Sequence, residues 1–173
     1  MQRKLAKKEE FYKIKQALKS LFPAFNEEEF DFDGDVEKIG NAYYFLIKNG
    51  KTVGVANAYR YKVCERSLWL GWFGVLAEHQ GKGYGSEILA LFERESKKEG
   101  YTHIRLFTDK FENDKVIAFY QKNGYKKEDY YCEEDPSSRM YKVLIFSKNL
   151  NGKAVEPWDN KNINLTLELK KQL

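Results

Sequence analysis

The stretch that decides the fold reads Gln80-Gly81-Lys82-Gly83-Tyr84-Gly85-Ser86, between an apolar run ending near Leu76 and an amphipathic run starting at Ser86. Its glycines let the backbone adopt positive φ and approach a ligand closely. The first N–H groups of the predicted helix lack partners within that helix, and the helix dipole adds partial positive charge there. Strand, glycine-rich turn and helix start together predict a cradle for a phosphate group.

Two common phosphate-binding motifs do not fit this stretch. A Walker loop needs an upstream glycine and Ser or Thr after Gly-Lys, whereas Gly81-Lys82 is followed by Gly83. A dinucleotide fingerprint needs a glycine where Ser86 stands, and it opens a βαβ unit rather than following a meander of strands. Taken alone, the glycines fit a tight turn without a ligand equally well.

Upstream of the loop, the patterns predict a helix followed by three strands. Apolar residues at helical spacing between Phe11 and Phe22 predict an amphipathic helix that ends before Pro23. Asn49-Gly50 favours a type I′ turn between two of the strands. Gly71 and Gly74 indicate a bulge or a close backbone approach in the third strand. The predicted strands are a short one at 2–5 and longer ones at 42–47, 52–61 and 67–76.

Downstream, two helices alternate with three strands. A helix at 86–99 ends at Gly100, and a second helix begins after Asn113 and ends at Gly124, which are natural C′ glycines. The predicted strands lie at 103–108, 125–132 and 140–147. The order predicts an α/β (α+β) fold, a mixed sheet with helices on its faces.

The tail after Lys148 alternates apolar and polar residues between Ile163 and Leu169, which predicts a half-buried strand. We interpret 1–148 as one domain and 149–173 as an extension that adds an edge strand to it. Pairing of that strand across a dimer interface is the alternative, so the chain is expected to be a monomer or a homodimer.

Composition narrows the functional classes. The chain has 173 residues, of which 42% are hydrophobic, and its net charge of +4 is spread among interleaved acids and bases. A nucleic-acid binder usually concentrates its basic residues in one patch, so no nucleic-acid partner is expected. No apolar run spans a membrane, and the N-terminus resembles no export signal, so we expect a cytoplasmic protein with reduced thiols. Two cysteines and two histidines lie apart, so no metal site is predicted.

Two motifs resemble those of the GNAT superfamily of N-acetyltransferases. Gln80-x-x-Gly83-x-Gly85 matches the family's Arg/Gln-x-x-Gly-x-Gly/Ala signature. Asn113, with Tyr120 seven residues on and then Gly124 and an aromatic residue, is similar to its second motif. The resemblance covers about 42–147 and implies a GNAT-like, mostly antiparallel sheet of about six to seven strands. It also implies acetyl-CoA as co-substrate and direct acetyl transfer to a primary amine through a ternary complex.

The resemblance also implies roles for individual residues. Cofactor contacts are expected from the signature loop and the strand before it, where Gly74 admits the pantetheine arm and backbone amides polarise the thioester. Tyr120 stands where the family has the general acid for the leaving thiolate. Asn113 contacts the cofactor, caps its helix, or does both. The expected cofactor-binding residues are Phe73, Gly74, Val75, Gln80, Gly81, Lys82, Gly83, Tyr84, Gly85, Ser86 and Asn113.

The general base is less well defined. Freeing a primary amine of its proton at neutral pH costs about 4–5 kcal/mol, so a base or a pocket that lowers the amine's pKa is needed. Where some members carry a glutamate before the signature, this chain has apolar residues between Trp69 and Phe73. Glu78 is a weak candidate base that fits bonding to loop amides better. His79, Asp109 and a water relay are the alternatives.

The acceptor is expected to be a small-molecule amine or a peptide. The family places its acceptor site against two segments that are acidic here, which favours a cationic acceptor such as a polyamine, an aminoglycoside or a lysine-bearing peptide. Solvated loops kept soluble by charge are the simpler explanation of the same acids. A non-catalytic acyl-CoA sensor or partner-binding module, and a nucleotide-phosphate binder, remain alternatives. The acids are Glu27, Glu28, Glu29, Asp31, Asp33, Asp35, Glu128, Asp129, Glu133, Glu134 and Asp135.

Overall fold

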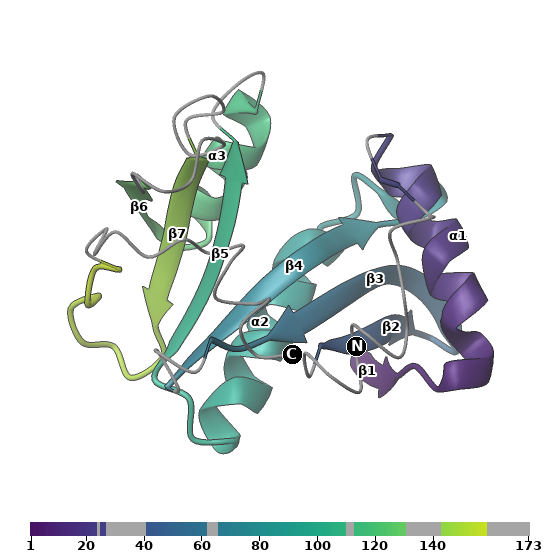
Figure 1. Cartoon of the computed structure of the whole chain (residues 1–173), viewed down its shortest axis with the longest axis horizontal. Coiled ribbons are helices and arrows are strands. Elements are labelled where there is room, and N and C mark those ends of the chain that lie inside the picture. Colours follow the sequence, from purple (N-terminus) through teal and green to yellow (C-terminus); the bar gives the residue numbers. More distant parts are fainter. Residues whose placement is uncertain (24, 27–40, 62–65, 110–112, 131–142, 159–173) are drawn as a thin grey trace. The chain divides into compact units, whose positions relative to one another are not determined.

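A computed structural model of the chain describes residues 1–23, 25–26, 41–61, 66–109, 113–130 and 143–158 (Figure 1). Several predictions lie outside these residues, namely the strand at 163–169, both cysteines, the acids of 27–35 and those of 133–135. The elements in chain order are β1 (Gln2–Leu5), η1 (Lys8–Glu10), α1 (Phe11–Leu21), β2 (Ala42–Lys48), β3 (Lys51–Tyr59), β4 (Ser67–Val75), η5 (Ala77–His79), α2 (Tyr84–Lys98), β5 (His103–Asp109), α3 (Asp114–Lys122), β6 (Lys126–Asp129) and β7 (Val143–Asn149).

The strands form one seven-stranded sheet in the order β1-β2-β3-β4-β5-β7-β6. The β1–β2, β2–β3, β5–β7 and β6–β7 pairs are antiparallel, and β4 pairs with β5 in parallel. The predicted fold class, a mixed and mostly antiparallel sheet with helices, is therefore confirmed. The predicted turn is confirmed too, because Asn49 and Gly50 have φ of 51° and 75°.

The described chain divides into two compact units. Unit 1 comprises 1–60 and 70–95, and unit 2 comprises 61–69 and 96–158. Strand β4 therefore begins in unit 2 and continues in unit 1, and almost all of α2 belongs to unit 1.

In unit 1, α1 and α2 cover opposite faces of the sheet (Figure 1). Side chains alternate along β2, so Tyr43 and Tyr44 point to different sides. Phe11 of α1 packs edge-on against Tyr43, with 5.1 Å between ring centroids. Phe92 of α2 packs in the same way against Tyr44 at 5.7 Å. The apolar stripe that predicted α1 thus forms one core layer, and the stripe of α2 forms the other.

In unit 2, α3 covers one face of the sheet and the start of the C-terminal extension lies on the other. The ring of Tyr120 in α3 packs at a tilt against the ring of Phe146 in β7, with 5.2 Å between their centroids. Trp158 packs edge-on against Trp69 of β4 at 5.0 Å, on the face that carries Arg105. Arg105 and Phe146 occupy adjacent cross-strand positions of β5 and β7, whose side chains point to opposite faces. The described part of the extension therefore packs on the face of the sheet.

Candidate functional site

The glycine-rich loop of unit 1 has the geometry of an anion cradle. Gly81 and Gly83 have φ of +73° and +76°, and an ideal Cβ on either would meet no atom of the described residues within 4 Å. Helix α2 starts directly afterwards at Tyr84, two residues earlier than predicted, and the Glu87 N–H donates to the Gly83 carbonyl at 3.3 Å. The N–H groups of Tyr84, Gly85 and Ser86 therefore precede the helical ladder. These N–H groups belong to the residues that the sequence predicts to bind a phosphate.

Side chains of the loop hold it to the end of β4. The Gln80 amide Nε2 donates to the Val75 carbonyl at 2.9 Å. The Lys82 ammonium donates to the carbonyl of Glu78, the middle residue of η5, at 2.9 Å. The Gln80 side chain, predicted as a cofactor contact, is thus bonded to the end of β4 and holds the loop there.

The second half of β4 is more open than the first half. Residues 67–70 are buried, whereas 71–75 are partly or fully exposed. Gly54 of β3 lies so close to the Gly74 carbonyl that a Cβ on Gly54 would collide with it, and a Cβ on Gly74 would lie 2.8 Å from Leu21. The close backbone approach predicted at Gly74 is confirmed, and Phe73, Gly74 and Val75 lie in the open half of the strand.

Tyr120, in unit 2, is buried among aromatic rings. Its ring contacts Phe119, Tyr125 and Phe146 at centroid distances of 5.2, 5.9 and 5.2 Å. Burial raises the pKa of the Tyr120 phenol well above its usual value. The phenol is therefore protonated throughout the neutral range and can act as a proton donor.

Asn113 stands at the N-cap position of α3, but its side chain makes no capping hydrogen bond. Its φ and ψ of −110° and 21° lie outside the extended region that a capping side chain needs. Its amide Nδ2 instead donates to the Thr108 hydroxyl of β5 at 3.3 Å. The capping interpretation is thus wrong for the side chain, which is held beside the end of β5.

Of the candidate bases, Glu78 and His79 have side chains that the structure describes. Glu78 has a side chain that is 67% exposed, and its carboxylate lies 4.0 Å from the His79 imidazole. Its main-chain carbonyl, rather than its carboxylate, contacts the loop through Lys82. The side chain of Asp109 lies outside the described part of the structure.

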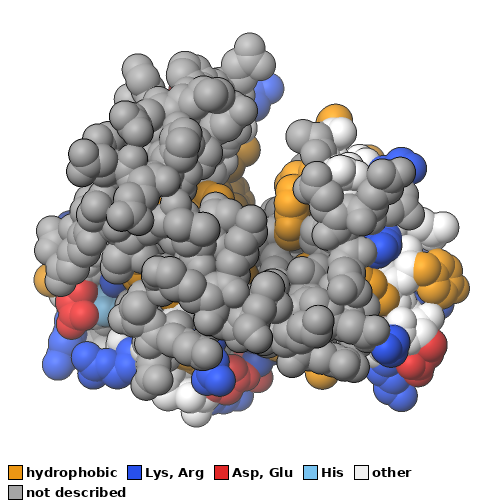
Figure 2. All heavy atoms as spheres, in the orientation of Figure 1, with side chains coloured by type: hydrophobic (Ala, Val, Ile, Leu, Met, Phe, Trp, Pro, Cys, Tyr) orange, Lys and Arg blue, Asp and Glu red, His pale blue; other side chains and the backbone are white. Residues whose placement is uncertain are grey.

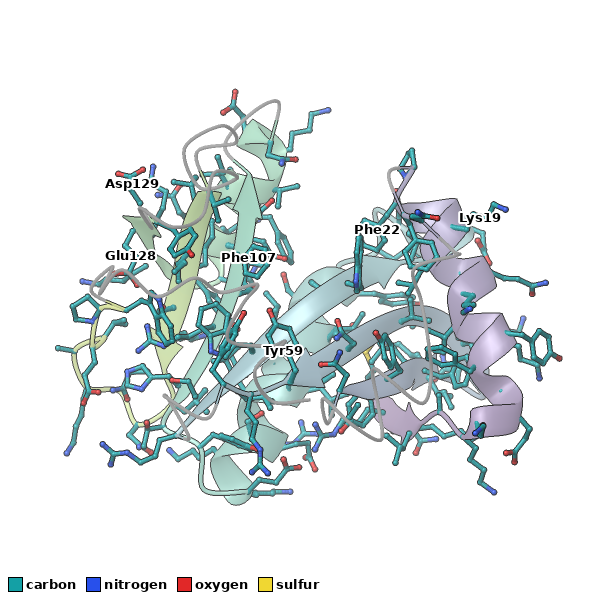
Figure 3. All side chains as sticks on the ribbon, in the orientation of Figure 1. Lys19, Phe22, Tyr59, Phe107, Glu128 and Asp129 are labelled. Carbon is teal, nitrogen blue, oxygen red and sulfur yellow. The ribbon has the colours of Figure 1, made fainter. Side chains whose placement is uncertain are left out.

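Two unit 1 residues that the sequence analysis missed lie beside the predicted site residues. Trp72 of β4 is 37% exposed, and its ring packs edge-on against Phe22 and Phe25 at 5.1 and 5.6 Å. Figure 3 labels Phe22 just beyond the end of α1. Lys48, at the end of β2, contacts Tyr84 and Glu87 at the start of α2. Trp72 could have been found as a large aromatic residue between strand glycines, whereas no local signal indicates Lys48.

Three further observations concern metal ligands, membrane helices and basic side chains among the described residues. Within the described residues, no three His, Cys, Asp or Glu side chains are grouped so that they could hold a metal ion. The described helices include none with the length and apolar character to cross a membrane. On the face drawn in Figure 2, described basic side chains lie in several places rather than in one patch.

Comparisons with known proteins agree with this geometry. The family model described as "Acetyltransferase (GNAT) family" matches residues 9–125. No curated protein sequence matches the chain. Among solved structures, spermidine N-acetyltransferase from Vibrio cholerae in complex with CoA and spermine is 16% identical, with a TM-score of 0.66, over 87% of this chain and 95% of that one. The ribosomal-protein-S18-alanine N-acetyltransferase of Escherichia coli is 17% identical, with a TM-score of 0.66, over 91% and 97%. At these identities the solved structures show a shared fold.

Proposed function

The chain belongs to the GNAT acetyltransferase family, and we propose that it transfers the acetyl group of acetyl-CoA to a primary amine on a cationic small molecule or peptide. Membership makes it an acyltransferase with acetyl-CoA as co-substrate. The observation that carries the proposal is the loop of unit 1 in front of the first turn of α2. There Gly81 and Gly83 have positive φ, and no described atom lies within 4 Å of a Cβ added to either.

The backbone of unit 1 supplies the cofactor contacts in this proposal. N–H groups from Gly81 to Ser86 bind the pyrophosphate, because they are aligned with the positive end of the α2 dipole. Gln80 and Lys82 hold that loop through the Val75 and Glu78 carbonyls. The open half of β4, from Phe73 to Val75, presents backbone groups to the pantetheine arm.

Acetyl-CoA supplies the thioester, and transfer forms a C–N bond to the amine while the C–S bond breaks. In this proposal Tyr120 donates its phenolic proton to the departing sulfur, because it stands at the position that carries the general acid in the family's second motif. In unit 2, we propose that Asn113, whose side chain donates to the Thr108 hydroxyl, also contacts the cofactor. Replacing Tyr120 by Phe retains the ring contacts and removes the proton. We expect kcat to fall by about 10²- to 10⁴-fold with the KM for acetyl-CoA little changed.

For removal of the amine's proton we propose Glu78 as the first candidate to test, directly or through water, because its carboxylate side chain is 67% exposed. If Glu78 is the base, Glu78→Gln should lower kcat/KM for the amine by about 10²- to 10⁴-fold. An unchanged kcat/KM would mean that the amine loses its proton to another group. His79→Gln is the matched variant, since the two side chains are adjacent.

The cationic acceptor is supported by two observations. Trp72 offers an exposed indole beside Phe22 and Phe25, and an indole face attracts an ammonium group. The solved structures of similar fold include enzymes for spermidine, one of them bound to spermine. In contrast, Glu128 accepts a hydrogen bond from the Trp158 N–H at 2.7 Å, so it serves the packing of unit 2 rather than the steering of substrate.

The test is calorimetric titration of acetyl-CoA into the parent protein and into Gly83→Glu. The new carboxylate would occupy the cradle and repel the pyrophosphate, so binding should be abolished. Gly100→Glu is the matched control, because Gly100 also has positive φ (+91°) and open surroundings but follows the other end of α2. An amine panel with polyamines and a lysine peptide then follows. Equal binding by Gly83→Glu would refute the cradle, and tight binding without turnover on any amine would indicate an acyl-CoA sensor.

A further inference from the structure

Lys48 makes an ion pair with the first turn of the helix that follows the cradle. Its ammonium Nζ lies 2.5 Å and 2.6 Å from the two carboxylate oxygens of Glu87. The same ammonium lies 4.5 Å from the centroid of the Tyr84 ring. Tyr84 is the first residue of α2, and the Glu87 N–H makes the first helical bond to Gly83. Lys48 therefore touches the helix start on which the cradle depends.

The position of Glu87 poses an electrostatic problem for an anion site. A carboxylate in the first turn stabilises a helix through the dipole. However, the same carboxylate lies within one turn of the backbone N–H groups that would bind a pyrophosphate, and like charges repel. A compensating cation at Glu87 removes that repulsion while leaving the carboxylate in place for the helix.

The Lys48 ammonium is suited to this compensation. It contacts both oxygens of Glu87, and its side chain is 25% exposed whereas that of Glu87 is 42% exposed, so the pair is screened less than a fully solvated one. Its contact with the Tyr84 ring adds a cation–π attraction and fixes the first residue of α2. The tight turn at Asn49-Gly50 starts directly after Lys48 and anchors the backbone from which the side chain reaches α2.

We propose that Lys48 is a positioning residue of the cofactor site, which neutralises Glu87 and holds Tyr84 so that the start of α2 accepts the pyrophosphate of acetyl-CoA. The inference rests on the proposed function in taking the glycine-rich loop as the pyrophosphate site. It differs from a direct phosphate contact, because the charge of Lys48 is directed at Glu87.

The experiment measures the Kd of CoA by calorimetry for three variants. Lys48→Met leaves Glu87 uncompensated, and the Kd should rise about three- to tenfold, as expected for one partly screened charge near the phosphates. Glu87→Gln removes the repulsion and leaves the ammonium, so the Kd should stay the same or fall. The double variant Lys48→Met/Glu87→Gln removes both charges, and its Kd should return to within about twofold of the parent value. Lys51→Met is the control, because Lys51 is the exposed cross-strand partner of Lys48 and loses the same charge.

Salt separates charge compensation from simple loss of structure. The difference between Lys48→Met and the parent should shrink at about 0.5 M salt, because the repulsion is screened. A Kd that is unchanged in Lys48→Met, weaker in Glu87→Gln, or as weak in the double variant as in Lys48→Met would overturn the inference. Because Glu87→Gln tests the idea without altering Lys48, failure of Lys48→Met to fold would still leave a decisive measurement. If the parent protein binds no CoA, it is the cradle that fails, and the two failures are thereby distinguished.

Discussion

Replacement of Arg105 should strongly lower the free energy of unfolding, because its side chain joins several parts of unit 2. It is only 3% exposed, and its guanidinium donates to the Ser67 hydroxyl at 3.1 Å, the Ser147 hydroxyl at 2.7 Å and the Glu156 carbonyl at 2.8 Å. These bonds join β4, β5 and β7 to the C-terminal extension. The guanidinium also lies 3.8 Å from Glu128 and 5.7 Å from the Trp158 ring centroid. The change to test is Arg105→Met, which keeps an unbranched apolar stem and removes the guanidinium donors.

The expected cost follows from these contacts. Hydrogen bonds to a charged group contribute about 1.5–3 kcal/mol each, which gives a gross loss of several kcal/mol. The variant no longer has to bury a charged group, and the desolvation cost that it avoids offsets part of this loss. Removal of one partner from a buried charged network usually costs about 3–5 kcal/mol net. We therefore expect the free energy of unfolding to fall by about 3–5 kcal/mol.

Urea unfolding followed by circular dichroism measures the global loss. Hydrogen exchange of the Trp158 amide, which donates to Glu128, reports whether the extension is released. Lys126→Met is the control, because it removes one exposed positive charge from β6 opposite Ser147. A loss below about 1 kcal/mol, with the Trp158 amide still protected, would refute the reasoning and show that packing alone holds this face.

Three further predictions concern other residues. Burial, with the positive charge of Arg105 as a second cause, lowers the pKa of His103 in the folded protein. As the pH falls, His103 therefore gains its proton in the unfolded chain before it does so in the folded one. The stability that His103 contributes above about pH 6.5 is lost as the pH falls below that value. His103→Gln should flatten that loss in urea unfolding between about pH 7 and pH 5, and an equally steep loss would contradict it. Gly54→Ala should cost about 1–3 kcal/mol, because its Cβ would collide with the Gly74 carbonyl, and an unchanged urea midpoint would argue against this close approach. Trp72→Ala should raise the KM for a polyamine by about threefold to thirtyfold and leave the KM for acetyl-CoA unchanged, as measured by steady-state kinetics. A change in the KM for acetyl-CoA alone would contradict a role of the indole in binding the acceptor.

Local patterns in the sequence predicted much of the fold. The α1 stripe, the Asn49-Gly50 turn and the glycines before α2 each depend on neighbouring residues, and the structure has each of them. Asn113 shows where a local rule fails. Asparagine before a helix is a good capping residue, but the backbone there is not extended and the side chain reaches back to Thr108.

Contacts between distant positions could not be predicted. Lys48 and Glu87 are 39 positions apart, and Arg105 and Glu156 are 51 apart. Neither pair has a sequence pattern of its own, because each depends on which faces of the sheet the elements cover. The sequence indicates the signature loop because phosphate binding needs glycines close to one another there. Lys48, which we propose compensates the charge of Glu87, lies in β2, far from the loop in the sequence.

The division of β4 between the two units affects how the protein emerges during synthesis. Once residue 95 has emerged from the ribosome, every described segment of unit 1 is available to fold, since domains form from the N-terminus onward. Residues Ser67–Trp69 cannot yet complete their pairing, because their parallel partner in β5 begins only at His103. A nascent chain that has emerged to residue 95 but not to His103 would carry Leu68 and Trp69, which are buried in the finished protein, on a strand edge without that partner. This short edge is where we expect a nascent chain to be most prone to aggregate or to be held by a chaperone.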